Sequence, residues 1–318
     1  MNSDTKYFGR YYHLTIGNPS SPILDVKTEA GKPAMDIKFD VTYARGQVVR
    51  EGTISVLGLS MKTMQQILKL SAMARGDALS KAVRVKIDAG YSSAAGWINL
   101  LDGYVWTSTI TSPPTMWLQM QVSEYHIAGG KSYAGADEVK GQSITKLCKS
   151  IAEIYSELEY GNKRQIVFRD KTTDNLCDKE KTCSVKLFGK NLRDALVEMS
   201  KSLSDKVVFT LLRDSSEGEG VGVICAYDKD PQKAAKGTIL VDEDHGLLSV
   251  SGVSVTDATV TQFLTKNQND LTYLQLVSKL NPQGNDKYII MQIKHFGHFE
   301  GNEWYTQYTC TGRPSLKK

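Results

Sequence analysis

Long apolar runs are missing from this 318-residue sequence. None approaches the roughly 20 residues that a membrane-spanning helix requires. The first ten residues, MNSDTKYFGR, also lack the apolar core of a signal peptide. We therefore expect a protein that is made and kept in the cytosol and has no membrane partner.

Strong charge of one sign is absent as well. The 39 Lys and Arg residues and the 35 Asp and Glu residues leave a net charge of only +4. Nucleic-acid-binding domains usually concentrate basic residues, so this balance argues against a DNA-binding role. Apolar residues make up 41% of the chain and charged residues 23%, as in a soluble globular protein large enough for two to four domains.

Cysteine is scarce and is not paired in the sequence. The five cysteines include no C-x-x-C motif, and an odd number does not suggest a disulfide framework. Cys177 and Cys183 are the closest pair. We expect the cysteines to be small buried hydrophobic residues rather than redox or metal-binding groups.

Strand signals dominate residues 1–128. Ile37, Phe39, Val41 and Tyr43 alternate with polar residues, as in a half-buried strand. Further strands are expected at 11–17, 52–60, 83–91, 98–110 and 115–125. One helix is predicted after Ser60, with Met64, Ile67, Leu68 and Ser71 on one face and Gly76 as its stop. This order predicts a small antiparallel barrel or sandwich.

Residues 129–235 combine helix and strand signals, unlike the strand-rich residues 1–128. The glycine-rich and polar segment 126–142 reads as a linker. Ser143 can cap a helix whose apolar stripe runs from Ile144 to Leu158, and a second helix places Leu192, Leu196, Met199 and Leu203 on one face. A hairpin is expected around SSEGEG. The prediction here is a mixed α/β region, followed by a second all-β unit over 236–318.

Candidate catalytic motifs are few. GEGVG (218–222) and GKN (189–191) lack the order of strand, glycine loop and helix that a phosphate loop requires, so both are interpreted as turns. The acidic run VDEDHG (241–246) lacks the spacing of a calcium loop and reads as a solvated turn. No G-x-S-x-G motif is present. We therefore predict no catalytic, cofactor-binding or metal-binding residues.

The segment HFGHFEGNEW (295–304) is the strongest exception. His295, His298, Glu300 and Glu303 are all residue types that bind zinc. Between two antiparallel strands, however, the segment forms a hairpin, and residues three apart on a strand point to opposite faces. Its histidines and acids are then expected at a loop tip or rim. Whether His295, His298 and Glu300 hold a metal stays open.

This ending resembles the last strands of the central baseplate hub proteins of phage tails, which include the Mu-like hub, late control protein D and the hub part of type VI secretion spikes. The matching positions are Ile293, His295, Gly297, Gly301, Trp304, Thr306 and Cys310. DHGLLSVSGV (244–253) is similar to the segment that opens the same barrel. GTISVLGLS, the helix after it, VKIDAGY and LLDGYVW are similar to the family's first domain, with Gly58 and Leu101 in place of its usual Asn and Phe. The resemblance covers about 1–128 and 236–318.

The resemblance implies an α+β, mainly β chain with two small antiparallel barrels connected by smaller α/β domains. In that family, three chains form a ring with six barrels, and the resemblance implies that this ring joins a hexameric tail tube to a trimeric central spike. The implied partners are further copies of the chain, the central spike, the tail tube and other baseplate proteins, with DNA only as passing cargo. The chain is then a structural component of the virion, made in the host cytoplasm, with no enzymatic activity and no cofactor.

Two other classes of function stay open. A tail-associated cell-wall hydrolase needs paired carboxylates in a cleft, and Glu300 and Glu303 are the residues to mutate in a degradation assay. A receptor- or carbohydrate-binding module displays aromatic residues on one face, and Trp97, Trp106 and Trp304 are the candidates. Trp106 and Trp304 are expected to be core or interface residues instead.

Overall fold

The structure is a computed structural model of the chain. It describes residues 9–18, 20–29, 33–44, 49–73, 83–92, 95–124, 138–139, 142–160, 166–172, 175–180, 185–203, 207–213, 222–228, 238–254, 256–266 and 273–312.

Three groups of elements follow one another along the chain. The first strand unit contains β1 (Arg10–Asn18), β2 (Ser21–Lys27), β3 (Ile37–Ala44), β4 (Glu51–Leu57), α1 (Met61–Met73), β5 (Arg84–Tyr91), β6 (Trp97–Ile110) and β7 (Trp117–Ser123). The middle unit contains β8 (Glu138–Val139), α2 (Ile144–Tyr160), β9 (Ile166–Asp170), α3 (Leu176–Lys179), β10 (Val185–Lys186), α4 (Leu192–Ser202), β11 (Val207–Arg213) and β12 (Gly222–Asp228). The second strand unit contains β13 (Thr238–Asp242), η6 (Glu243–His245), β14 (Leu247–Ser251), β15 (Asp257–Phe263), β16 (Tyr273–Val277), η7 (Pro282–Gly284), β17 (Asp286–His298) and β18 (Trp304–Thr311).

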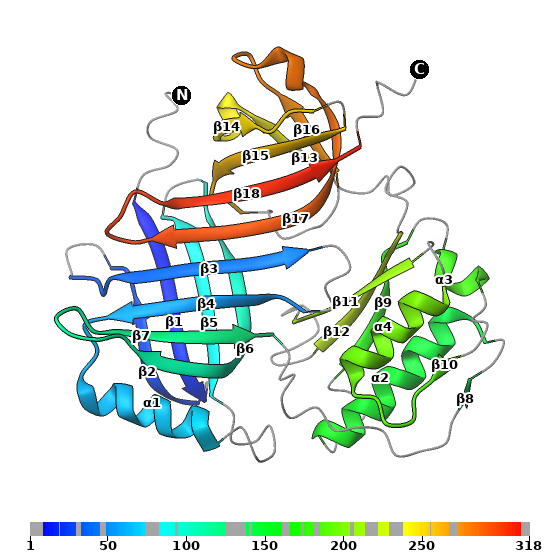
Figure 1. Ribbon diagram of the computed structural model, residues 1–318, viewed down its shortest axis with the longest axis horizontal. Coiled ribbons are helices and arrows are strands. Elements are labelled where there is room, and N and C mark those ends of the chain that lie inside the picture. The colour runs from blue at the N-terminus through cyan, green and yellow to red at the C-terminus, as the bar shows by residue number, and fades with distance from the viewer. Residues whose placement is uncertain are drawn as a thin grey trace.

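One sheet runs through both strand units. Its 13 strands follow the order β14-β15-β18-β17-β3-β4-β7-β6-β5-β1-β2, with β16 joined to β17 and β13 joined to β16 (Figure 1). The joint between the units is the antiparallel pairing of β17 with β3, from Gln292 opposite Ala44 to His298 opposite Lys38. This pattern confirms the expected α+β, mainly β class. Within the described ranges, hydrogen bonds connect the two units and close neither of them into a separate barrel.

The two strand units repeat the same arrangement. In the first unit, β3 pairs with β4, β4 with β7, β7 with β6 and β6 with β5. In the second unit, β14 pairs with β15, β15 with β18, β18 with β17 and β17 with β16. Thus β3, β4, β7, β6 and β5 correspond to β14, β15, β18, β17 and β16.

The long strands β6 and β17 share a further detail. The first half of each pairs with β5 or β16, and a bulge follows within its pairing to β7 or β18. The bulge lies at Trp106 in β6 and at Met291 in β17, and both side chains are exposed, at 39% and 37%. A bulge reverses the inward and outward alternation of the strand, which explains the exposure of these large apolar residues.

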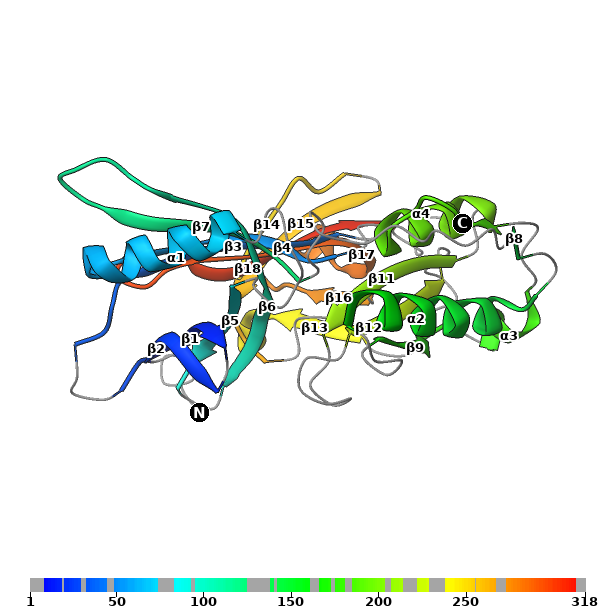
Figure 2. The ribbon, with the colours of Figure 1, turned by 90° about the horizontal axis from the view of Figure 1, so that it is seen from below.

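The strands of the large sheet form two layers, which are visible from the side. In Figure 2, β3, β4, β7, β14, β15 and β18 lie in an upper layer, and β1, β2, β13 and β16 lie in a lower layer. The hairpin between β6 and β7 projects beyond the body of the first unit, above α1 (Figure 2). The long strands β6 and β17 therefore cross from one layer to the other.

The cores of the two strand units are not independent. Trp304 of β18 and Leu264 belong to the buried cluster of the first unit, whereas Tyr43 of β3 belongs to that of the second. The expected division into domains 1–128, 129–235 and 236–318 stays a prediction, since residues 128 and 235 both lie outside the described ranges.

The middle unit is a small α/β sandwich. Strand β12 pairs with β11 in antiparallel and with β9 in parallel orientation. The helices α2 and α4 cover one face of this sheet (Figure 1). The opposite face carries a small cluster with Val223, Cys225 and Tyr227 at its centre. The mixed α/β elements expected here are thus present, while most of the expected linker 126–142 and the turn SSEGEG lie outside the described residues.

Candidate functional site

The outer face of the sheet at the joint is polar. On this face, β3 contributes Asp40 and Thr42, β4 contributes Glu51 and Thr53, and β17 contributes Lys294. On β3, Asp40 and Thr42 alternate with buried apolar side chains, so the same period that builds the core also builds this face. We refer to it as the joint face.

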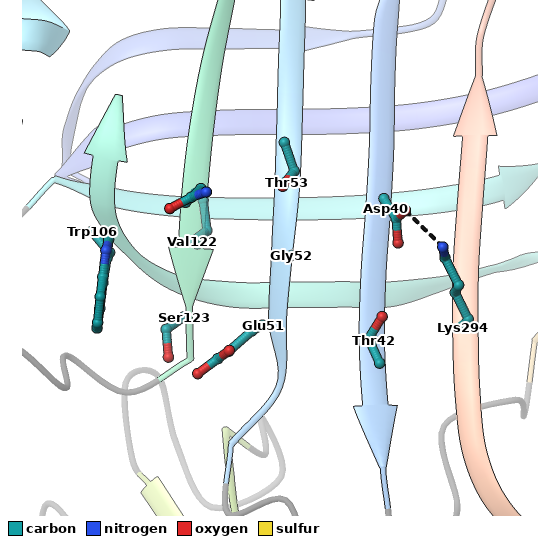
Figure 3. A pocket seen from close by; sticks show the side chains of 10 residues that line it. Asp40, Thr42, Glu51, Gly52, Thr53, Trp106, Val122, Ser123 and Lys294 are labelled. Atoms are coloured by element: carbon teal, nitrogen blue, oxygen red, sulfur yellow. Dashed lines mark ion pairs between the residues drawn. The ribbon is translucent and has the colours of Figure 1, made fainter. Parts of the chain in front are cut away.

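The joint face holds an open depression of about 490 Å³. Its walls come from β3, β4, β6, β7 and β17, and Figure 3 shows Trp106 at one side and the pair Asp40 and Lys294 at the other. A second depression shares Asp40, Thr53 and Lys294 with the first and extends toward His298 and Glu303. The two depressions together follow the sheet across the boundary between the strand units.

Basic groups on the joint face have nearby partners. The ammonium group of Lys294 lies 2.9 Å from Oδ2 of Asp40, and the two side chains are 38% and 51% exposed. The ammonium group of Lys38 lies 4.3 Å from the centre of the Trp117 ring, within the range of a cation–π contact. The face therefore offers balanced charge and hydrogen-bonding groups spread over several strands.

The segment 295–304 does form a hairpin between β17 and β18, as expected. His295, however, is not a loop-tip or rim group: it lies in β17, is 1% exposed, and its Nδ1 lies 2.9 Å from Oγ1 of Thr306. Burial, with a smaller contribution from the charge of Arg50, lowers its pKa from 6.5 to about 3. His295 is thus a neutral core residue.

His298 lies on the other side of the strand from His295. Its Nε2 is 2.8 Å from Oδ2 of Asp36, and its ring packs edge-on against Trp117. The backbone N–H of Glu300 donates to Oδ1 of Asp36 at 3.2 Å, and the side chains of Glu300 and Glu303 are exposed. Among the described residues, no group of three or more His, Cys, Asp or Glu side chains is placed to hold a metal ion.

Arg10, the first residue of β1, holds the turn of this hairpin. The guanidinium group of Arg10 donates hydrogen bonds to the carbonyl oxygens of His298 and Phe299, at 2.9 and 2.8 Å, and also to that of Gly301. Arg10 also lies over the ring of Trp304, 5.6 Å from its centre. No local pattern in the sequence indicates this role of Arg10, because its partners lie nearly 300 residues away.

The three tryptophans considered for ligand binding do not form one exposed surface. Trp304 is 1% exposed and belongs to the core, whereas Trp97 is 50% exposed and stacks on Tyr11. Trp106 is 39% exposed and lines the depression on the joint face. Trp304 is therefore a core residue, as expected.

Other residues considered from the sequence have structural contacts. The acidic run VDEDHG forms the end of β13 and a 3₁₀ turn, and Oδ1 of Asp242 accepts a hydrogen bond from the N–H of His245. The cysteines at 148, 177, 225 and 310 are buried, as expected, and Cys183 lies outside the described residues. Across the described chain, no helix has both the length and the apolar character to span a bilayer.

One protein-family model matches a long segment of the chain. The model named Baseplate hub gp41 matches residues 23–187, just over half of the sequence. The chain belongs to the baseplate hub gp41 family. This baseplate hub chain is accordingly a structural component of a phage tail. No curated protein sequence matches it.

Solved structures place the baseplate hub chain in the same fold group. A tail protein from Neisseria meningitidis MC58 is 9% identical, with a TM-score of 0.56, over 96% of this chain and 97% of that protein. The 43 kDa tail protein of prophage MuSo2 from Shewanella oneidensis is 12% identical, with a TM-score of 0.54, over 97% and 98% of the two chains. The E. coli c3393 protein, a type VI secretion component described as similar to T4 tail proteins gp27 and gp5, is 11% identical, with a TM-score of 0.54, over 91% and 79%.

Proposed function

We propose that three copies of the chain form a ring that joins a hexameric tail tube to a trimeric central spike. One observation carries the proposal: each chain holds two strand units of the same arrangement, side by side in one sheet. Three copies then present six similar units toward the tube, and the chain as a whole repeats only three times toward the spike. The membership of the baseplate hub family supports the same assembly.

The ring also suggests a role for the joint face. We propose that this face lines a channel through which the genome passes. Phosphate groups bind wherever unpaired Lys and Arg gather, and such binding would slow the passage of DNA. The pairing of Lys294 with Asp40 and the position of Lys38 over Trp117 support a lining of low positive potential.

Solution mass and low-resolution imaging test the assembly. The purified chain, alone and mixed with the spike protein of the same phage, is examined by light scattering and negative-stain electron microscopy. The expected result is a species of three chains that appears as a ring with a central opening. A chain that stays monomeric even with the spike protein contradicts the proposal.

A further inference from the structure

The joint inside the chain has two corresponding strand edges that lack a partner strand among the described residues. Within the chain, the second half of β17 pairs with β3. The corresponding strands are β6 for β17 and β14 for β3. Among the described residues, β6 has β7 as its only strand partner from Thr107 to Ile110, and β14 has β15 as its only strand partner. Each therefore leaves one edge of backbone N–H and C=O groups open.

These open edges also lack the usual protection. Exposed edge strands in monomeric proteins commonly carry charged residues or proline, which prevent pairing with another chain. Residues 105–112 (VWTSTITS) and 247–254 (LLSVSGVS) contain neither. By contrast β2 contains Pro22, Asp25 and Lys27. Strand β13, whose only strand partner among the described residues is β16, contains Asp242. The two unprotected edges are thus the two that correspond to the joint.

We propose that β14 of one copy pairs with the second half of β6 of the next copy, so that the contact between copies repeats the joint inside the chain. The inference rests on the proposed ring and names the surface that closes it. A closed ring of identical chains needs two different, complementary surfaces on each copy. The edges of β6 and β14 supply them, since they differ in sequence and belong to different strand units.

The correspondence between the two strand units also predicts which residues of β6 and β14 lie opposite each other. The bulges align Thr107 with Gln292, so that Thr109 corresponds to Lys294. Pairing through β4 and β15 aligns Ser251 with Asp40, so that Val253 corresponds to Thr42. Lys294 pairs with Thr42 in the joint. Thr109 of one copy is therefore expected opposite Val253 of the next.

The exposed apolar side chains agree with this contact. Leu248 in β14 is 44% exposed, Val253 just after β14 is 36% exposed, and Trp106 beside the β6 edge is 39% exposed. Pairing of the two edges would cover part of this surface and satisfy the open backbone groups, the two contributions that hold strand-addition interfaces together. The charge-free composition of both edges leaves no like-charge repulsion to oppose it.

A cross-linking experiment tests the register. Thr109→Cys and Val253→Cys are combined in one chain, rings are isolated by mass, and a short bis-maleimide joins thiols through two thioether bonds. The expected result is a ladder of covalent dimers and trimers on a denaturing gel. The two single variants and the pair Asp25→Cys with Val253→Cys serve as controls, since Asp25 lies on the protected edge. These controls should stay as single chains.

The outcomes separate the two proposals. Rings that form normally but give no ladder, or that link equally well through Asp25, overturn the β6–β14 contact and leave the ring in place. If no ring forms even with the spike protein, the proposed function fails and the contact fails with it.

Discussion

The indole Nε1 of Trp304 donates a hydrogen bond of 2.8 Å to the carbonyl oxygen of Gly90. Trp304 begins β18 in the second strand unit, whereas Gly90 lies in β5 of the first. A side chain at Gly90 is not possible without rearrangement, because its φ is 157° and a Cβ atom would lie 2.5 Å from Cα of Trp97. The two units are thus locked together by a buried ring as well as by strand pairing.

Shortening Trp304 should destabilise the whole chain. Trp304→Ala is expected to cost about 3–5 kcal/mol in the free energy of unfolding, because a large core side chain leaves a cavity. Trp304→Phe should cost about 1–3 kcal/mol, since the Gly90 carbonyl loses its donor. Urea unfolding at pH 7 measures both. The control Trp97→Ala removes a half-exposed ring and should cost far less; equal losses for Trp97 and Trp304 contradict the assignment.

Arg50 and Glu124 form a buried ion pair whose disruption should be costly. Their side chains are 6% and 1% exposed, and Nε of Arg50 lies 2.9 Å from Oε1 of Glu124. Glu124→Gln leaves the guanidinium charge without compensation and should cost about 3–5 kcal/mol in urea unfolding. Asp40→Asn, which breaks the exposed pair with Lys294, is the control and should change stability by at most about 1 kcal/mol.

Stability should fall in mild acid because of His295. Its pKa is lowered from 6.5 to about 3, so the unfolded chain binds a proton between these pH values and the folded chain does not. The stability of the folded state is therefore fully present above about pH 6.5 and decreases as the pH falls toward 3, by at most about 1.4 kcal/mol per pH unit. His295→Gln should reduce the loss between pH 7 and pH 5. Identical pH profiles for variant and wild type contradict this origin.

Glu243 should hold the segment after β16 in place. Its Oε1 accepts hydrogen bonds from Oγ of Ser278 and the backbone N–H groups of Lys279 and Leu280. Hydrogen bonds to the charged carboxylate lower its pKa below 4.5, so its contribution is present above that pH and is lost as the pH falls through the lowered value. Glu243→Gln should speed amide hydrogen exchange at residues 278–280 at pH 7. Asp244→Asn breaks the exposed pair between Asp244 and Nζ of Lys279, which are 3.9 Å apart, and should change the exchange far less.

Local patterns predicted much of the first strand unit. The alternation of Ile37, Phe39 and Val41 with exposed Lys38 and Asp40 appears in β3 as expected. The predicted cap of α1 is also present, since Oγ of Ser60 accepts a hydrogen bond from the N–H of Thr63. These features depend only on neighbours along the sequence. The predicted stop at Gly76 lies outside the described residues.

In β17, a bulge makes strict alternation of inward and outward residues a wrong guide to burial. Strict alternation would place Ile289, Met291, Ile293 and His295 on one face, but Met291 is exposed and Ile290 is buried. One extra residue at the bulge shifts the parity of everything before it. Such an insertion depends on the partner strand, which the sequence of β17 does not reveal.

The joint itself could not be read from the sequence. Residues 292–298 pair with residues 38–44, and no local signal connects segments so far apart. The depression on the joint face and the place of Trp304 in the first unit's core both depend on this pairing. The resemblance to baseplate hubs indicated the kind of protein, whereas the site needed the three-dimensional arrangement.

The entry of Trp304 into the core of the first unit has a consequence for synthesis on the ribosome. Chains generally begin to fold from the N-terminal end as they emerge, and contacts between distant segments form late. Here the first unit cannot complete its core until β18 has been translated. Until then, the edge of β3 and the apolar pocket for Trp304 remain exposed. The nascent chain is therefore expected to depend on chaperones that cover this edge until β17 and β18 arrive.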